Sequence, residues 1–104
     1  MSRELRISPA LLAVLTELLQ GDTRGEQLHG YALIKATGYQ SGTIYPILKR
    51  LEKAGWVHRQ KEEIDEWKEH RRARVFYQLS EVGVGEARAI IESTRQLLRQ
   101  LDPT

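Results

Sequence analysis

The sequence of 104 residues contains no cysteine and no apolar stretch long enough to cross a membrane. Without cysteine there is no disulfide framework and no thiol nucleophile. A membrane-spanning helix needs roughly 18 consecutive apolar residues, and no run approaches that length. The first residues carry Arg3, Glu4 and Arg6 and lack the apolar segment of a secretion signal. We therefore expect a cytoplasmic protein that does not associate with membranes.

Motifs typical of enzymes are missing as well. The sequence has no G-x-S-x-G nucleophile elbow, no G-x-x-x-x-G-K-[ST] phosphate loop and no H-E-x-x-H zinc motif. His58 and His70 could face each other across a hairpin, but no pattern of carboxylates or thiols accompanies them. His29 is expected to cap or pack beside a helix. The sequence thus predicts no enzyme, no metal site and no cofactor.

The composition is that of one small globular domain. Hydrophobic residues make up 40% and charged residues 29%, with a formal net charge of +2. A chain of this length can bury a core, although an oligomer would add to its stability. The mildly basic balance permits nucleic-acid binding without establishing it, so the distribution of charge matters more than the total.

The most informative stretch is residues 41–56, which predicts a helix followed by a turn. Ser41 can cap the helix, Pro46 is acceptable close to its start, and Gly55 favours the left-handed conformation that ends a helix. Apolar residues recur every three or four positions, at Ile44, Ile47, Leu48 and Leu51. The remaining surface holds Thr43, Tyr45, Lys49, Arg50 and Lys53. One face should pack on a core while the other meets a partner.

Two helices are predicted before this stretch. The first begins at Ser8-Pro9, a cap followed by a proline at the first helical position, and stops at Gly21. Its broad apolar face could be buried entirely in its own core or could also meet a partner chain. After a polar link, a second helix is expected over residues 28–37, ended by Gly38. The short connection from there to the next helix is typical of a helix-turn-helix.

Beyond Gly55 the periodicity becomes alternating and predicts a hairpin of strands 56–61 and 74–79. The connection, residues 62–72, is acidic at first and basic at its end. Its cations would lie along a phosphate backbone in the manner of a wing: Arg71, Arg72 and, at the strand, Arg74. Alternatively, the opposite charges pair across a solvated loop. Trp67 could cover the hairpin's own apolar surface or contact a partner.

A last helix is expected over residues 81–101, capped by Ser80 and ended by Asp102-Pro103. Its apolar positions follow a heptad spacing, and we assign them to dimerisation: Val84, Ala87, Ile91, Thr94, Leu98 and Leu101. Such a helix should pair with another helix. The alternative is that it folds back on its own domain.

Three stretches together resemble a known family. They are Leu28-His29-Gly30-Tyr31, then Gly42-Thr43-Ile44-Tyr45-Pro46-Ile47-Leu48-Lys49-Arg50-Leu51-Glu52, and finally Arg72-x-Arg74-x-x-Tyr77-x-Leu79-Ser80-x-x-Gly83. They closely resemble the PadR family of bacterial transcriptional regulators, whose members are dimeric winged-helix repressors of phenolic-acid, drug-efflux and other stress genes. The resemblance implies that one set of residues lies at or near DNA: Ser41, Gly42, Thr43, Tyr45, Pro46, Lys49 and Arg50. The acidic wing with its tryptophan departs from the common pattern, as do Val82 and Val84.

The expected fold is mainly α with a small β-hairpin. Residues 1–80 would form a winged helix-turn-helix DNA-binding domain and residues 81–104 a C-terminal dimerisation helix, together one compact unit. The expected function is a homodimeric transcription factor, a repressor, that binds double-stranded DNA at a pseudo-palindromic operator. The resemblance and the spare apolar faces also allow for a small aromatic effector between the protomers. The alternative function is a winged-helix protein-interaction module without an operator.

Overall fold

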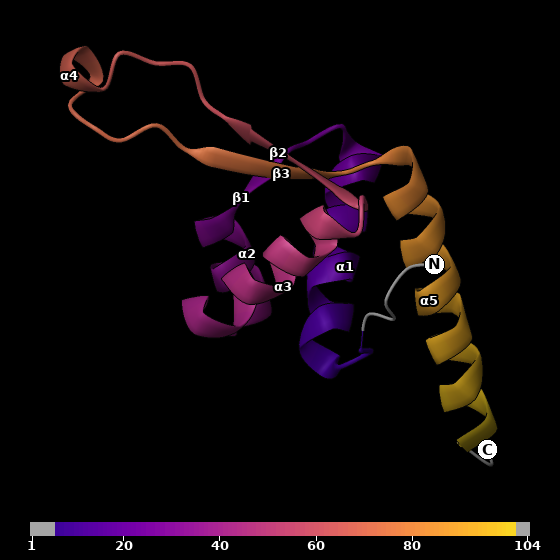
Figure 1. The fold of residues 1–104 in the computed structure, drawn as a ribbon. Coiled ribbons are helices and arrows are strands. Elements are labelled where there is room, and N and C mark those ends of the chain that lie inside the picture. The colour runs from indigo at the N-terminus through magenta and orange to yellow at the C-terminus, as the bar shows by residue number, and fades with distance from the viewer. Residues whose placement is uncertain (1–5, 102–104) are drawn as a thin grey trace.

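The structure, a computed structural model, describes residues 6–101 and contains five helices and three strands within that range. In chain order they are α1 (Pro9–Arg24), β1 (Leu28–His29), α2 (Gly30–Thr37), α3 (Ser41–Lys53), β2 (Val57–Lys61), α4 (Glu66–Glu69), β3 (Val75–Leu79) and α5 (Glu81–Leu101). Figure 1 shows α1, α2 and α3 grouped beneath the strands, α5 beside α1, and α4 at the far end of a long hairpin. The predicted winged-helix class, mainly helical with a small β-hairpin, is confirmed.

The core forms where α1, α2 and α3 turn their apolar faces toward one another beneath β3. The largest fully buried side chains all come from these three helices: Val14, Leu15, Leu18, Leu33, Ile44, Leu48 and Leu51. Tyr77 and Leu79 of β3 and Ala87 of α5 close the same cluster. Among residues 6–101 no polar or charged side chain is buried. Burial of apolar surface therefore drives the folding of this domain.

The start of α1 matches the prediction, but its end does not. The Ser8 Oγ accepts a hydrogen bond from the Leu11 N–H at 3.1 Å, as expected of a capping serine. Gly21 was predicted to stop the helix, yet α1 continues to Arg24 and ends at Gly25, whose φ is 72°. A β-carbon at Gly21 would lie 3.3 Å from the Leu28 side chain. This glycine therefore permits close packing against β1 rather than ending the helix.

The predicted start of α3 is wrong, whereas its predicted end is correct. Gln40 occupies the N-cap position without a side-chain cap, so the prediction that Ser41 caps the helix is wrong. Pro46 lies inside the helix rather than near its first residue, and it supplies no N–H to the Gly42 carbonyl. The C-terminus is as predicted. Gly55 has a φ of 82°, and the chain then closes with a 2.9 Å bond from the Trp56 N–H to the Leu51 carbonyl.

The predicted hairpin is present, and a third strand joins it. The strands run antiparallel in the order β1-β3-β2, with Val57 opposite Leu79 and Lys61 opposite Val75. Each hairpin strand starts one residue later than predicted. Residues Leu28 and His29 were assigned to the second helix but form β1 opposite Tyr77 and Phe76. Two residues are too few for an alternating pattern, so only the partner strand reveals β1.

The last helix has the predicted bounds within the described residues, and Ser80 caps it as expected. The Ser80 Oγ accepts from the Gly83 N–H at 3.0 Å and donates to the Gly55 carbonyl at 2.7 Å. The first half of α5 packs on α1, while its far end extends beyond the other helices (Figure 1). The predicted terminator Asp102-Pro103 lies outside the described residues. Within residues 6–101, none of the helices combines the length and apolarity that a membrane span requires.

The contact between α5 and the turn after α3 yields a stability prediction. A β-carbon at Gly83 would overlap the carbonyl oxygen of Trp56, which also accepts the Ser80 N–H at 2.8 Å. Gly83→Ala should therefore lower the free energy of unfolding by about 1–3 kcal/mol, the usual range for overpacking. Chemical denaturation measures this change.

Gly85 provides the matched control on the same helix. A β-carbon there meets nothing within 4 Å. Gly85→Ala should raise the free energy of unfolding by about 0.5–1 kcal/mol, because alanine loses less backbone entropy than glycine in a helix. If both substitutions lowered the free energy of unfolding equally, the close contact between Gly83 and the Trp56 backbone would not be the cause of the destabilisation.

Candidate nucleic-acid interface

The residues that the sequence assigns to DNA lie together on the outer face of α3. Ile44, Ile47 and Leu48 are buried on the opposite face, which fixes the rotation of the helix about its axis. Thr43 is half-buried, and the other assigned residues of this helix are exposed: Ser41, Gly42, Tyr45, Pro46, Lys49 and Arg50. The Arg50 Nε lies 3.4 Å from the Pro46 carbonyl. One face of α3 therefore packs on the core as predicted, and the contact of the other face with a partner stays a prediction.

The uncapped start of α3 leaves backbone donors facing outward. The first intrahelical bonds are donated by Thr43 and Ile44, both to the Gln40 carbonyl. The N–H groups of Ser41 and Gly42 precede these bonds, and no side chain of the N-cap residue covers them. Free N–H groups and the positive end of a helix dipole together favour an anion such as a phosphate. The missing serine cap is therefore compatible with a binding role for this end.

Tyr45 packs against α2 with part of its side chain and exposes the rest to solvent. Its ring lies so close to Gly30, at the start of α2, that a β-carbon there would be 2.6 Å from the Tyr45 Cε1. The side chain nevertheless remains 43% exposed. The hydroxyl end of the ring is the part nearest to Gly30, so this tyrosine packs on the start of α2 and leaves only part of its ring surface open to a partner.

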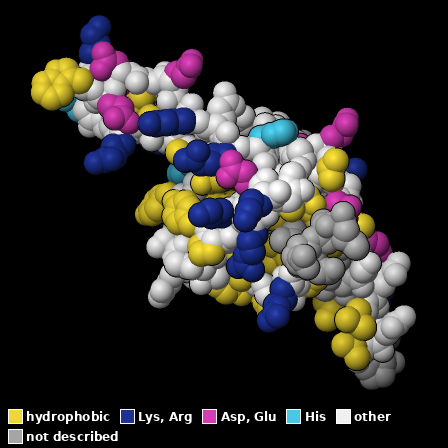
Figure 2. Space-filling view, in the orientation of Figure 1, with side chains coloured by type: hydrophobic (Ala, Val, Ile, Leu, Met, Phe, Trp, Pro, Cys, Tyr) yellow, Lys and Arg dark blue, Asp and Glu magenta, His cyan; other side chains and the backbone are white. Residues whose placement is uncertain are grey.

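A groove runs between α3 and the hairpin and is bordered by cations. It consists of two hollows of about 430 and 300 Å³, and both are lined by Tyr45, Tyr77 and Arg59. Arg74 lines the first, and Lys49 lines the second together with one carboxylate, Glu52. Figure 2 shows Lys and Arg side chains gathered over α3 and the base of the hairpin. This cationic surface matches the negative charge of a phosphate backbone.

Arg59 is a member of this surface that the sequence analysis missed. It lies on β2 opposite Tyr77 and is exposed. Val57, two residues earlier, is buried in the core. Residues two apart on a strand share a face, so the position of Val57 places Arg59 on the side of the helices. That spacing was the available indication.

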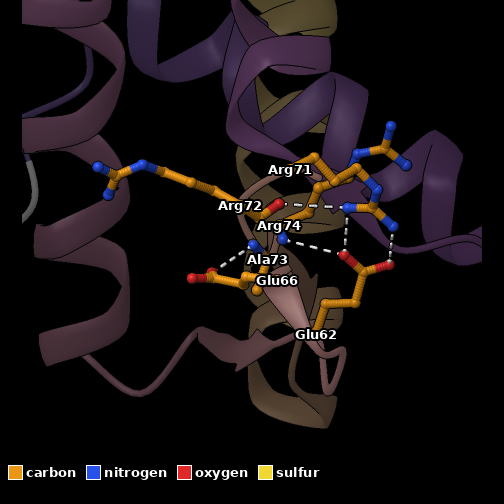
Figure 3. A network of polar contacts seen from close by, with 6 residues as sticks. All are labelled: Glu62, Glu66, Arg71, Arg72, Ala73 and Arg74. Carbon is orange, nitrogen blue, oxygen red and sulfur yellow. Dashed lines mark hydrogen bonds and ion pairs between the residues drawn. The ribbon is translucent and has the colours of Figure 1, made fainter. Parts of the chain in front are cut away.

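The outer end of the hairpin, residues 62–74, is held by a network of hydrogen bonds to carboxylates (Figure 3). We call this segment the wing tip. The Glu62 carboxylate accepts two bonds from the Arg71 guanidinium, at 2.8 and 3.1 Å, and a third from the Arg74 N–H at 3.0 Å. The Glu66 carboxylate accepts the Ala73 N–H at 2.6 Å. The sequence predicts a loop here, because α4 has four residues and is too short to show a helical period.

Arg71 is therefore placed differently from the cations around it. The pairing of opposite charges across the loop, considered as an alternative, is present for Glu62 and Arg71. The Arg71 hydrogen bonds, followed by that of the Arg74 N–H, lower the pKa of Glu62 to about 2 from 4.5. The same pair raises the pKa of Arg71. Arg72 and Arg74 are exposed, and the Arg72 side chain extends away from Glu62 in Figure 3.

Trp67 projects from α4 into solvent. Its side chain is 88% exposed, so it does not cover the apolar surface of the hairpin, one of the two roles considered for it. The backbone N–H of Trp67 donates to the Asp65 carboxylate at 3.1 Å, and this hydrogen bond caps the short helix. The backbone of this residue is thus fixed while its ring is free to meet a partner.

The predicted dimerisation residues of α5 become more exposed from the start of the helix to its end. Ala87 is fully buried and Val84 packs on the core, so both face their own chain. Ile91 and Thr94 are half-buried. Leu98 and Leu101 are 60% and 70% exposed, beside the exposed Leu97. The predicted seam therefore packs within the chain at one end and lies open at the other.

Comparisons with known proteins agree with this architecture. Residues 18–89 match the family described as "Transcriptional regulator PadR-like family". None of the curated proteins searched matches the sequence. A protein from Streptococcus mutans UA159, smu.1704, has a similar structure with a TM-score of 0.70 and 23% identity over 96% of this chain and 91% of its own.

Two further solved structures share the fold. A PadR-like transcriptional regulator from Bacillus cereus strain ATCC 14579 has a TM-score of 0.68 and 18% identity, covering 88% of this chain and 85% of its own. S. aureus MepR in its DNA-binding conformation has a TM-score of 0.64 and 19% identity, covering 92% and 67%. The family consists of transcriptional regulators and not enzymes. Because the family match spans well over half of the sequence, the chain belongs to the PadR-like family of transcriptional regulators.

Proposed function

We propose that this protein is a repressor that binds a pseudo-palindromic operator as a homodimer in the cytoplasm. The observation that carries the proposal is the exposed face of α3, which combines open N–H groups with Lys49 and Arg50 beside a cationic groove. A recognition helix inserts its N-terminal half into the major groove and reads base edges there. Residues 1–80 would bind DNA, and residues 81–104 would join the protomers.

The wing contributes contacts to the backbone in this proposal. Arg72 and Arg74 are exposed on the strand side of the wing tip, and Arg59 and Arg74 line the groove next to α3. Arginines at such positions bind phosphate and set the register of the protein on the duplex without reading its sequence. Arg71 is excluded from this set because Glu62 already holds its guanidinium.

The dimer rests on the open end of α5. Leu97, Leu98 and Leu101 form an exposed apolar group at the end of a helix that extends past its own domain (Figure 1). Two copies that bury these leucines would place their recognition helices on half-sites about one helical turn apart. Joining two weak DNA contacts in one particle raises the effective concentration of the second and hence the affinity.

The first prediction from this proposed function tests the orientation of α3. Replacing both Lys49 and Arg50 with alanine should weaken DNA binding about tenfold or more at low salt and reduce the salt slope by about 2, since each cation releases counterions. Arg24→Ala with Arg88→Ala removes the same charge elsewhere on the surface and should change the slope little. Titrations of labelled DNA at several salt concentrations measure both. If the wild-type protein binds no DNA at any salt concentration, the result would favour the protein-interaction module instead.

The second prediction concerns the dimer. Leu98→Glu would place a charge on each side of the proposed two-fold contact, where it cannot be paired. We expect a folded monomer whose operator affinity is lower by about a hundredfold, the loss of effective concentration. Sedimentation velocity and circular dichroism report assembly and folding. Gln96→Glu, which adds the same charge off the seam, should remain dimeric; a dimeric Leu98→Glu would place the interface elsewhere.

The third prediction concerns an effector, which we propose to be a planar aromatic compound bound between the protomers. A hollow of about 200 Å³ lies between α1 and α5 on the proposed dimer face and is lined by Leu12, Thr16, Ile91, Thr94, Arg95 and Leu98. A ligand there should raise the melting temperature in proportion to the logarithm of its concentration. Thr16→Phe, which fills the hollow, should abolish the shift. A panel of planar aromatics that shifts neither protein would contradict the proposal.

A further inference from the structure

The first part of the wing tip is acidic, although the segment is expected to lie beside DNA. Five carboxylates occur between positions 62 and 69 against one lysine, whereas Arg71, Arg72 and Arg74 follow, so residues 62–74 carry five carboxylates and four cations. Phosphate repels the carboxylates, whereas a wing must approach it. The acidic residues are therefore expected to make a favourable contribution that offsets this repulsion. Their hydrogen bonds to the backbone of the wing tip make such a contribution.

Three of these five carboxylates accept hydrogen bonds from the backbone of the wing tip itself. Asp65 accepts the N–H groups of Trp67 and Lys68, at 3.1 and 3.2 Å, and thereby starts α4. Glu66 accepts the Ala73 N–H at 2.6 Å, and Glu62 accepts the Arg74 N–H at 3.0 Å. No residue of α4 is buried. With no apolar core at this end, these charge-assisted bonds replace packing as the source of order.

Glu62 has a special position because it ends the strand ladder. Its own N–H donates to the Arg74 carbonyl at 2.8 Å, and its carboxylate accepts the Arg74 N–H. The Glu62 carboxylate thus accepts the Arg74 N–H, which a backbone carbonyl would accept if the strand ladder continued. The same carboxylate holds both terminal nitrogens of Arg71, so one residue fixes two points on the returning chain (Figure 3). Arg72 lies between these two points.

We propose that Glu62 is a positioning residue for DNA binding, which closes the wing tip on Arg71 and so presents Arg72 and Arg74 to the phosphate backbone. This inference rests on the function proposed above. Arg71 acts as the partner of Glu62 and not as a DNA ligand. An acidic residue thus promotes binding to an acidic polymer, through the geometry it imposes on neighbouring cations.

The proposal predicts an effect opposite in sign to simple electrostatics. Glu62→Gln removes a negative charge near DNA, which by charge alone would tighten binding. Because the wing tip loses its clamp, we expect binding about tenfold weaker at low salt and a shallower salt slope, as if two phosphate contacts were lost. Glu63 is exposed and is the matched control. Glu63→Gln removes the same charge from the same segment and should leave affinity unchanged or slightly raised.

A double-mutant cycle separates a positioning role from direct contact. If Arg71 acts only through Glu62, the combination of Glu62→Gln with Arg71→Gln should bind DNA no more weakly than either single variant. The exchanged pair, Glu62→Arg with Arg71→Glu, should recover part of the lost affinity. Additive losses and no recovery would mean that Arg71 contacts phosphate directly, which overturns the proposal.

A titration of the free protein tests the clamp without DNA. The pKa of Glu62 is lowered to about 2 from 4.5. The stabilisation it provides is complete above pH 4.5 and is lost as the pH falls from 4.5 toward 2. Carboxyl NMR should show Glu62 titrating near 2 in the wild type and closer to 4.5 in Arg71→Gln. Amide exchange at Arg74, whose N–H the Glu62 carboxylate accepts, should accelerate over the same range.

The outcomes distinguish this inference from the proposed function. A wild-type protein that binds no DNA rejects both. If the wild type binds DNA while Glu62→Gln and Glu63→Gln bind equally well, the proposed function stands and the role of Glu62 is rejected. Weaker binding by Glu62→Gln, with an unchanged melting temperature and faster amide exchange at Arg74, supports the role of Glu62.

Discussion

The packing of α3 on α1 is the interaction on which the rest of the structure depends. Ile44, Leu48 and Leu51 are at most 1% exposed, and their burial sets the rotation of α3 about its axis. That rotation alone determines that Lys49 and Arg50 point outward. The Gly55 turn then starts β2 from the same end of the helix, which brings Arg59 alongside Tyr45. Burial of apolar surface thus arranges a cationic surface whose own charges would repel one another.

Much of the fold could be predicted because its elements have local causes. Ser8, Ser80, Gly38 and Gly55 end or begin elements through bonds within a few residues, and each was identified from sequence. What could not be predicted depends on partners far along the chain. β1 is such a case, because its two residues form a strand only by pairing with β3. Gly21 has a nearer cause, since it lies within a helix that continues to Arg24 and its missing side chain leaves room for Leu28. Neither cause is visible in the local pattern.

The candidate site divides in the same way. The outer face of α3 follows from periodicity, whereas the state of each cation depends on its neighbours in space. Arg71, Arg72 and Arg74 look alike in sequence, but among these three it is the guanidinium of Arg71 that pairs with a carboxylate nine residues earlier, while Arg74 meets the same carboxylate through its backbone N–H. Arg59 escaped notice because a single arginine on a strand gives no pattern until Val57 fixes the face. The failed prediction of a serine cap shows the converse, since an absent contact leaves donors open for a partner.

The wing tip and the core are stabilised by different forces, and this separates two properties of the protein. Core stability comes from buried side chains of α1 to α3, β2, β3 and α5, and none of the buried residues lies within 62–74. The wing tip has no buried residue in α4 and depends on carboxylate bonds that remain in contact with water. Exposed ion pairs contribute little to global stability, yet a bidentate pair still selects one geometry. The conformation of the wing tip can therefore change while the domain stays folded, and under the proposed role of Glu62 such a change alters DNA binding without any change in the core.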